Sequence, residues 1–243
     1  VYAAQTFQLG DMPFVAALGD VMVEETIRGY QELQLGTDEI VKRVNLDYPL
    51  TMRLHTTAMW VALPVALAEG AAYEPPAPDA DGDGQAEQAS ADEQGPAAGL
   101  HAMQHLLTGV MPLMVMCDRR DVDGFYHVAH PNLGDAPVVF LYDAYEGGIG
   151  LAEVAYQRVE ELLRLAHETV ARCGCATGCP SCIQSGACRL RNEQLDKGLA
   201  RDILASMLQQ GTVGDPALLA RYRATVPTIQ QPTAEASRYR PGQ

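Results

Sequence analysis

The first 64 residues show the alternation of apolar and polar positions that is typical of half-buried β-strands. The alternation is clearest at the positions Met52, Leu54, Thr56, Ala58 and Trp60. Glycine-containing turns separate the runs, so we predict strands over residues 26–30, 39–44 and 50–64, with a hairpin turn at 35–38. The first residue is Val, and we expect the chain to open inside a domain.

A spacing of three to four residues replaces the alternation after residue 100, which indicates helices. We predict helices over residues 100–110, 151–172 and 192–208, and short buried strands over 113–116 and 137–142. Pro112 is expected to end the first helix, because proline has no backbone N–H to donate. Asn192 is expected to cap the third helix. The glycine-rich turn at 147–150 either binds an anion or lets its neighbours pack close to the strand.

Composition divides the chain further. Residues 69–96 contain eight acidic residues and no Lys or Arg, and such a sequence cannot bury enough apolar surface to fold. Residues 79–84 resemble the start of a calcium loop, but Ser90 stands where a bidentate Glu is needed. We therefore predict an α+β protein with an antiparallel β-rich part (1–68), a disordered acidic insertion (69–99), a mixed α/β core with a cysteine module (100–210) and a flexible tail (211–243).

Five of the six cysteines lie between residues 173 and 188. The gaps after Cys175 are three, two and five residues, and thiolates at such spacings can reach one ion from tight turns. The sequence therefore predicts a zinc knuckle that joins the second and third helices as a clip. The predicted ligands are Cys175, Cys179, Cys182 and Cys188, with Cys173 as the alternate to Cys175.

Other uses of these thiols fit the sequence less well. A disulfide framework would leave one of five thiols unpaired, and bridges across two or three residues gain little loop-closure entropy. The spacing also departs from the common ferredoxin runs of iron–sulfur proteins. Cys117 stands apart from the other cysteines and is expected to be a core thiol.

Two further groups of residues are candidates for chemistry. His101 and His105 have the spacing of a metal pair on a helix, but no third ligand accompanies them in the sequence, so we expect core or surface histidines. Asp118 and Asp121 flank two arginines and are expected to form a salt-bridge corner. A hydrolase that uses both with Asp143 is the other interpretation.

The net charge of −14 argues against nucleic acid as a partner, but residues 172–201 carry five basic side chains against two acidic ones. A local basic patch can bind phosphate, although solvated surface charge is the other interpretation. The predicted phosphate contacts are Arg189, Arg191, Lys197 and Arg201, with Arg119 and Arg120 as weaker candidates. No apolar run is long enough to span a bilayer, and the cysteine usage suits a reducing compartment, so we expect a cytoplasmic protein without a membrane partner.

Four blocks of the sequence, at residues 28–60, 101–121, 141–153 and 175–197, resemble one family. The last two blocks are the more specific ones, with Leu-Tyr-Asp-Ala-Tyr-Glu-Gly-Gly-Ile-Gly in one and Cys-Ala-Thr-Gly-Cys-Pro-Ser-Cys in the other. Together they resemble the carboxy-terminal zinc-binding region of superfamily 2 DNA helicases, the DUF1998 or MrfA zinc-binding domain. Such proteins usually follow the last cysteine with Gly-Asn, where this chain has Arg189-Leu190-Arg191.

The resemblance implies a domain appended to an ATP-driven 3′→5′ DNA helicase in repair, in which four cysteines hold one Zn²⁺ and the domain helps to engage DNA. The implied partners are single-stranded or forked DNA and helicase motor domains, in cis or in trans. The chain has no Walker A or DEAD/DEAH sequence, so we expect no catalytic residues here and ATP hydrolysis only in a parent protein. The alternative is a non-catalytic subunit of a phage-defence or repair complex that docks onto a separate helicase.

Overall fold

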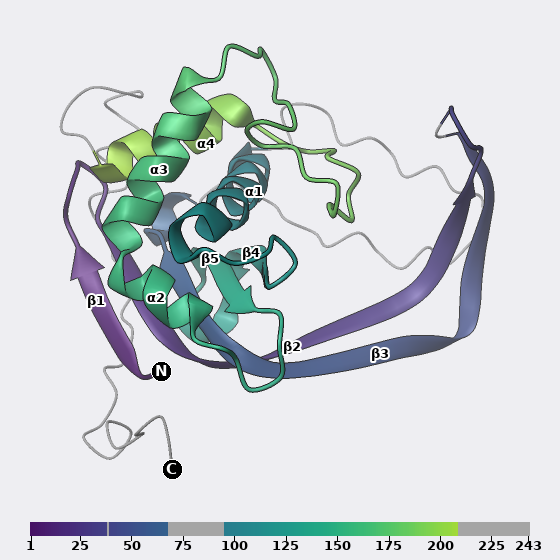
Figure 1. Ribbon diagram of the computed structural model, residues 1–243, viewed down its shortest axis with the longest axis horizontal. Coiled ribbons are helices and arrows are strands. Elements are labelled where there is room, and N and C mark those ends of the chain that lie inside the picture. Colours follow the sequence, from purple (N-terminus) through teal and green to yellow (C-terminus); the bar gives the residue numbers. More distant parts are fainter. Residues whose placement is uncertain (38, 68–94, 209–243) are drawn as a thin grey trace.

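A five-stranded antiparallel sheet forms the centre of the computed structural model, which describes residues 1–37, 39–67 and 95–208 (Figure 1). Across the sheet the order is β1-β2-β3-β5-β4, with β1 Ala3–Phe7, β2 Phe14–Leu33, β3 Ile40–Ala62, β4 Val122–His130 and β5 Ala136–Asp143. The helices are η1 Val65–Leu67, α1 Gly95–Val115, η3 Pro131–Leu133, α2 Leu151–Gln157, α3 Val159–Arg172 and α4 Lys197–Leu208. This arrangement confirms the predicted α+β class, with an antiparallel amino-terminal β region and a cysteine cluster between two helices.

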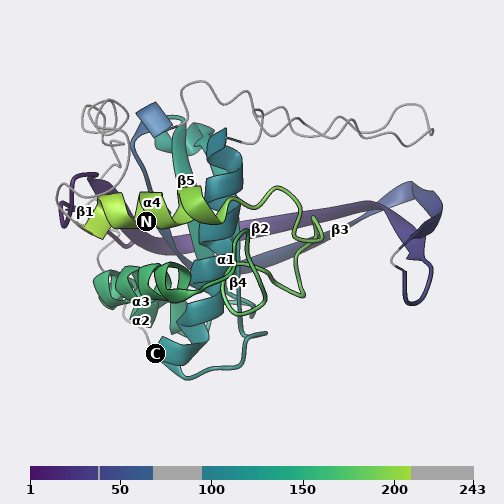
Figure 2. The same ribbon diagram turned by 90° about the horizontal axis from the view of Figure 1, so that it is seen from above.

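Strands β2 and β3 form one long hairpin in place of the several short strands that we predicted. They stay paired out to Leu33 and Ile40, and the predicted turn beyond them is confirmed, with Gly36 at φ 89°. The register of the β2–β3 pairing shifts between Ile27 and Gly29. Such a bulge accommodates an extra residue without ending the strand, so the glycine does not divide β2. The outer part of the hairpin projects away from the body of the protein (Figure 2), and we call it the arm (residues 22–33 and 40–55).

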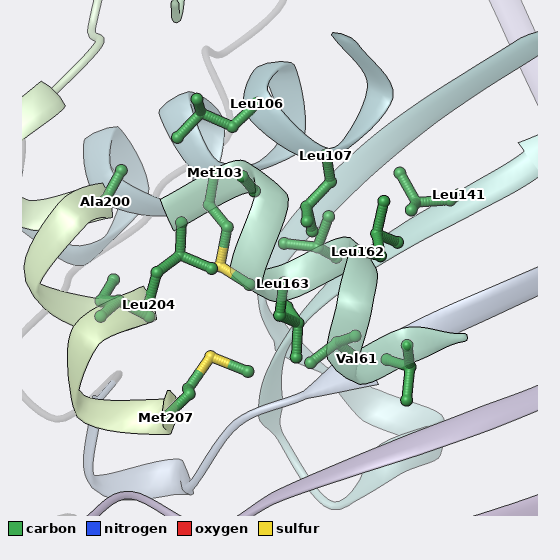
Figure 3. Close-up of a cluster of buried hydrophobic side chains, with 14 of the residues drawn as sticks. Val61, Met103, Leu106, Leu107, Leu141, Leu162, Leu163, Ala200, Leu204 and Met207 are labelled. Atoms are coloured by element: carbon green, nitrogen blue, oxygen red, sulfur yellow. The ribbon is translucent and has the colours of Figure 1, made fainter. Parts of the chain in front are cut away.

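The helices pack on the sheet and enclose the main hydrophobic core (Figure 3). Helix α1 is central to this core, because it contacts β4 and β5 of the sheet as well as α2, α3 and α4. The buried side chains here include Met103, Leu106, Leu107, Leu141, Leu162, Leu163, Leu204 and Met207. Each buried side chain of this size contributes roughly 1.5–3 kcal/mol. The core therefore fixes the ends of α3 and α4. The segment that connects them, residues 173–196, holds five cysteines, and we call it the cysteine loop.

The predicted end of the first helix at Pro112 is wrong. Helix α1 continues through Pro112 to Val115, so the strand expected over residues 113–116 is absent from this part of the described chain. The reason is that Val110 and Met111 before the proline and Met114 after it share one buried helical face. The helix ends at Val115, and the next residue, Met116, has φ 56° and donates its backbone N–H to the carbonyl oxygen of Pro112.

The helix predicted over residues 151–172 is divided in two at Arg158, whose backbone leaves the helical region at φ −117° and ψ 30°. The break has a structural reason. The guanidinium group of Arg158 donates to the carbonyl oxygen of Met114 at 2.9 Å and pairs with Glu161 at 2.5 Å. The arginine therefore satisfies a carbonyl in the last turn of α1, which has no partner within its own helix.

The predicted cap at Asn192 is also wrong. Helix α4 begins at Lys197, and the Asp196 carboxylate accepts the backbone N–H of Leu199 at 2.8 Å as its cap. Asn192 has φ 63° and uses its side chain to bind both backbone groups of Ser185, at 2.7 and 3.0 Å. It therefore closes the loop before α4.

The first residues of α1, 95–99, belong to the range predicted as an acidic insertion, and Ala98 and Gly99 are buried there. Residues 68–94, with the calcium-like sequence at 79–84, and the predicted tail at 211–243 lie outside the described residues. Among the helices that the structure describes, none combines the length and the apolar character required to cross a membrane.

Candidate metal centre

The loop between α3 and α4 brings four thiols together. The sulfur atoms of Cys173, Cys175, Cys179 and Cys182 all lie within 4.8 Å of one another. Three sulfur–sulfur distances are 3.5 Å, for the pairs Cys173–Cys175, Cys173–Cys179 and Cys175–Cys182, and the Cys179–Cys182 distance is 3.7 Å. We call these four residues the four-cysteine cluster.

The four-cysteine cluster has the dimensions of a tetrahedral zinc site. With Zn–S bonds of about 2.3 Å, two thiolate ligands are separated by about 3.8 Å. A disulfide would bring two sulfurs to about 2.0 Å, whereas all six cysteines are free thiols. Burial raises the pKa of the Cys182 thiol, and the backbone N–H of Cys179, which donates to its sulfur at 3.3 Å, opposes that rise. The residues present therefore suit a zinc-type metal.

The tight turn between Cys175 and Cys182 depends on one glycine. Gly178 has φ 132°, and a Cβ at this position would lie 2.6 Å from the side chain of Ile183. Ile183 is itself fully buried in the main core. The loop can therefore fold back over its own anchoring residue only because position 178 has no side chain.

Cys188, predicted as a ligand of the same ion, lies at a different place. Its sulfur is 3.5 Å from Nε2 of His101 on α1, and it forms a second group with His101 and His105. Cys173, the predicted alternate, takes part in the four-cysteine cluster, and Cys175 belongs to the cluster too. The spacing could not reveal this arrangement, because the five residues after Cys182 are long enough to carry the chain to α1.

Lys197 points into the cysteine loop rather than into solvent. Its ammonium group donates to the carbonyl oxygens of Cys173 and Cys175 at 2.7 and 2.5 Å, and lies 3.2 Å from the Cys175 sulfur. Desolvation lowers the pKa of Lys197, but the hydrogen bond to Cys175 and the negative charge of that thiolate raise it more. The pKa of Lys197 therefore lies above its usual value. Desolvation raises the pKa of the Cys175 thiol, but hydrogen bonds with Cys173, Cys182 and Lys197 outweigh it and lower this pKa to about 6.

The other predicted phosphate contacts lie around this loop. Arg189 forms an ion pair at 2.8 Å with Glu25, at the base of the arm, and Arg201 pairs with Asp202 at 2.8 Å. Arg191 has φ 54° in the segment after Cys188 and is exposed. Three arginines therefore lie in or just beyond the loop, with part of their guanidinium surface in solvent.

The glycine-rich turn before α2 is filled by the protein's own carboxylate. Asp143, at the end of β5, is completely buried and accepts four backbone N–H groups at 2.6–3.2 Å, from Ile149, Gly150, Leu151 and Ala152. The donors that would bind an anion at this helix start are therefore already occupied. The turn serves packing and capping, and Asp143 has a structural role there.

Asp118 and Asp121 form a corner, but not the predicted salt bridge. Asp121 accepts the backbone N–H of Asp118 at 2.8 Å, and Asp118 accepts that of Arg120 at 2.9 Å. Among the residues that the structure describes, Arg119 and Arg120 form no ion pair with either carboxylate. Local backbone donors satisfy these acids instead, as is usual for Asp in turns, and the hydroxyl group of Tyr145 also donates to Asp121 at 2.7 Å.

The comparisons with known proteins agree with this geometry. The family model of the MrfA Zn-binding domain matches residues 103–183. MJ1572.1, an uncharacterised protein of Methanocaldococcus jannaschii, is 41% identical over 111 residues, which cover 45% of this chain and 99% of that protein. YprA, an uncharacterised ATP-dependent helicase of Bacillus subtilis, is 31% identical over 166 residues, which cover 68% of this chain and 19% of the helicase.

The ATP-dependent helicase hrq1 of Schizosaccharomyces pombe is 32% identical over 130 residues, 47% of this chain and 12% of that protein. A crystal structure of the DUF1998 helicase MrfA bound to DNA matches with a TM-score of 0.52 and 23% identity, over 84% of this chain and 25% of that one. At this identity the structural match concerns the fold. The chain thus spans a quarter or less of these helicases and nearly all of MJ1572.1, and it belongs to the MrfA zinc-binding domain family.

Proposed function

We propose that this chain is the zinc-binding accessory domain of an ATP-dependent 3′→5′ DNA helicase that acts in repair. The observation that carries the proposal is the four-cysteine cluster, held between α3 and α4 in a fold that matches part of a helicase. The chain contains no ATPase motif of its own, so the motor is supplied by other domains or by another chain. Its contributions are structural support and DNA engagement.

In this proposal Cys173, Cys175, Cys179 and Cys182 hold one Zn²⁺, which supplies a cross-link within the loop. A loop of this length has too few apolar residues to build a core, and Ile183 is its main buried anchor. Lys197 then joins the loop to the first turn of α4 through its bonds to Cys173 and Cys175. The ion therefore stabilises the connection between two core helices rather than performing chemistry.

The arm is the surface that we propose for contact with the motor. It carries large apolar side chains that are 42–85% exposed, namely Met22, Ile27, Tyr30, Leu33, Val41, Tyr48, Leu50 and Met52. A two-stranded hairpin that stands alone is only marginally stable in water, and exposed apolar surface of this extent is typical of a binding surface. The ion pair between Arg189 and Glu25 connects the base of the arm to the cysteine loop.

DNA engagement is proposed for Arg189, Arg191 and Arg201, through backbone phosphates and without sequence preference. Fluorescence titration of labelled single-stranded DNA at two salt concentrations tests this, with an Arg189→Ala/Arg191→Ala/Arg201→Ala variant. We expect the wild-type chain to bind more weakly at higher salt, and the variant to bind more weakly at both. Arg164→Ala, an exposed arginine of α3, is the matched control. The proposed DNA contact is contradicted if the wild-type chain does not bind DNA, or if the triple-arginine variant binds as tightly as the wild type.

The second candidate function is a separate subunit that docks onto a helicase encoded elsewhere. The match over 99% of MJ1572.1 favours it, because that relative consists of little besides this region. Co-purification with a tagged motor chain tests it, with Tyr48→Asp in the arm against Asp47→Asn beside it as control. Docking through the arm predicts that only Tyr48→Asp releases the chain. Retention of the Tyr48→Asp chain contradicts arm docking.

A further inference from the structure

His101, His105 and Cys188 form a second cluster of metal-binding side chains, apart from the four thiols of the four-cysteine cluster. The two histidines lie one turn apart on α1, with ring centroids 4.5 Å from each other, and are only 3% and 5% exposed. One ligand atom from each of the three residues lies within 4.8 Å of the others. His101 and Cys188 fall outside the matched residues 103–183.

The two imidazole rings are oriented as metal ligands are. Nδ1 of His101 lies 3.1 Å from the carbonyl oxygen of Gln194, and Nδ1 of His105 lies 2.6 Å from that of Ile183. A carbonyl oxygen only accepts, so both Nδ1 atoms carry the proton and both Nε2 atoms carry a lone pair. In metal sites the outer nitrogen of a histidine ligand commonly donates to a carbonyl in this way.

The Cys188 sulfur lies 3.5 Å from Nε2 of His101 and also accepts a backbone hydrogen bond. The backbone N–H of Asn192 donates to the Cys188 sulfur at 3.3 Å, the same contact that Cys182 receives from Cys179. Three non-glycine residues of this segment have positive φ values, Arg191 at 54°, Asn192 at 63° and Gln194 at 54°. Such backbone strain persists only where surrounding interactions impose it.

We propose that Nε2 of His101, Nε2 of His105 and the sulfur of Cys188 hold a second divalent transition-metal ion. Imidazole and thiolate ligands suit a metal of the zinc class. Within the described residues no fourth His, Cys, Asp or Glu joins the group, so the fourth position is available to water or to a donor from a bound partner. The segment from Cys188 to Gln194 would then be fixed to α1 by the ion, as the four-cysteine cluster fixes the preceding segment.

The two sites share a structural connection. The Cys182 sulfur belongs to the four-cysteine cluster, and the next residue, Ile183, provides the carbonyl oxygen that orients His105. Displacement of this short stretch alters both sites at once. Metal binding at one site is therefore expected to favour metal binding at the other.

The test is a count of metal ions per chain by inductively coupled plasma mass spectrometry, on the full chain prepared with Zn²⁺ under reducing conditions. We expect two ions in the wild type, one in Cys188→Ser and two in Cys117→Ser, whose thiol belongs to neither group. One ion in the wild type, or two in Cys188→Ser, overturns the proposal.

Cobalt titration keeps the test decisive if Cys188→Ser does not fold. Metal-free wild-type protein is titrated with Co²⁺ and followed by visible absorption. We expect saturation at two equivalents, with different spectra for the two steps, because four thiolates and a mixed nitrogen–sulfur set give different ligand fields. Saturation at one equivalent overturns the second site while leaving the proposal for the four-cysteine cluster intact. Saturation at two equivalents supports it.

Discussion

The ammonium group of Lys197 lies 3.2 Å from the sulfur of Cys175 and so connects the first residue of α4 to the four-cysteine cluster. The sequence predicts Lys197 as a DNA contact, but its three partners all belong to the cysteine loop. A positive charge next to a thiolate favours the ionised form that binds metal. Lys197 therefore supports the metal centre through its contacts with the cysteine loop.

Replacing Lys197 with Met should weaken metal binding in the four-cysteine cluster. Loss of a partner that supports a ligand typically costs 10–100-fold in metal affinity, so we expect faster zinc release of about that size. The measurement is the rate of zinc transfer to a chromogenic chelator, made in a Cys188→Ser background so that one site is observed. Arg201→Gln, which removes an exposed charge from the same helix, should release zinc at the unaltered rate. Equal rates for both variants would show that the Lys197 contacts do not support the site.

Asp143→Asn should strongly destabilise the protein. The carboxylate accepts four backbone N–H groups in the buried turn before α2, and an amide cannot accept from all of them. We expect the free energy of unfolding to fall by about 3 kcal/mol, measured by urea denaturation. The exposed Asp47→Asn is the matched control, for which we expect no change beyond about 0.5 kcal/mol.

Alanine substitutions at two adjacent glycines distinguish the cost of backbone strain from the cost of steric overlap. Gly147 and Gly148 both have positive φ, at 79° and 73°, but a Cβ at Gly147 meets nothing within 4 Å. A Cβ at Gly148 would lie 2.7 Å from Oγ1 and 3.1 Å from the backbone nitrogen of Thr57. We expect Gly147→Ala to cost about 1–2 kcal/mol and Gly148→Ala about 1–3 kcal/mol more. Thermal unfolding of the two variants measures the difference, and equal losses would refute the close packing against β3.

Cys117 should react slowly with iodoacetamide near neutral pH. Burial, and then the charges of Asp121, Asp118 and Asp143, raise the pKa of this thiol above its usual 9.0. The thiolate fraction at a given pH is therefore reduced, and the alkylation rate should continue to rise with pH beyond 9. Asp121→Asn removes one negative charge and should shift the rate profile to lower pH. Peptide mass spectrometry measures alkylation at Cys117 alone, and a profile that levels off at or below pH 9 would contradict the raised pKa.

The sequence predicted those parts of the fold that depend on local patterns. The hairpin turn near Gly36, the buried strand that became β5 and the existence of the helices follow from alternation, turn residues and periodicity. It failed where tertiary contacts decided the local structure. Pro112 remains inside α1 because the buried face continues beyond it, and Arg158 breaks a continuous helical pattern to reach the end of α1.

The cysteine site shows the same limit. Spacing identified a metal knuckle, but it could not decide how the five thiols divide, because that depends on which of them α1 approaches. The signal for the second cluster was present in His101 and His105, which have ligand spacing on a helix. Their missing partner, Cys188, lies 83 residues after His105 in the sequence, so only the fold brings it near.

Zinc X-ray absorption spectroscopy of the Cys188→Ser protein tests directly whether four thiolates between α3 and α4 hold one structural zinc ion. With the second site removed, we expect a first coordination shell of four sulfur atoms at about 2.3 Å. A shell that contains nitrogen or oxygen in place of one or more sulfurs, or a folded protein without bound zinc, would contradict it.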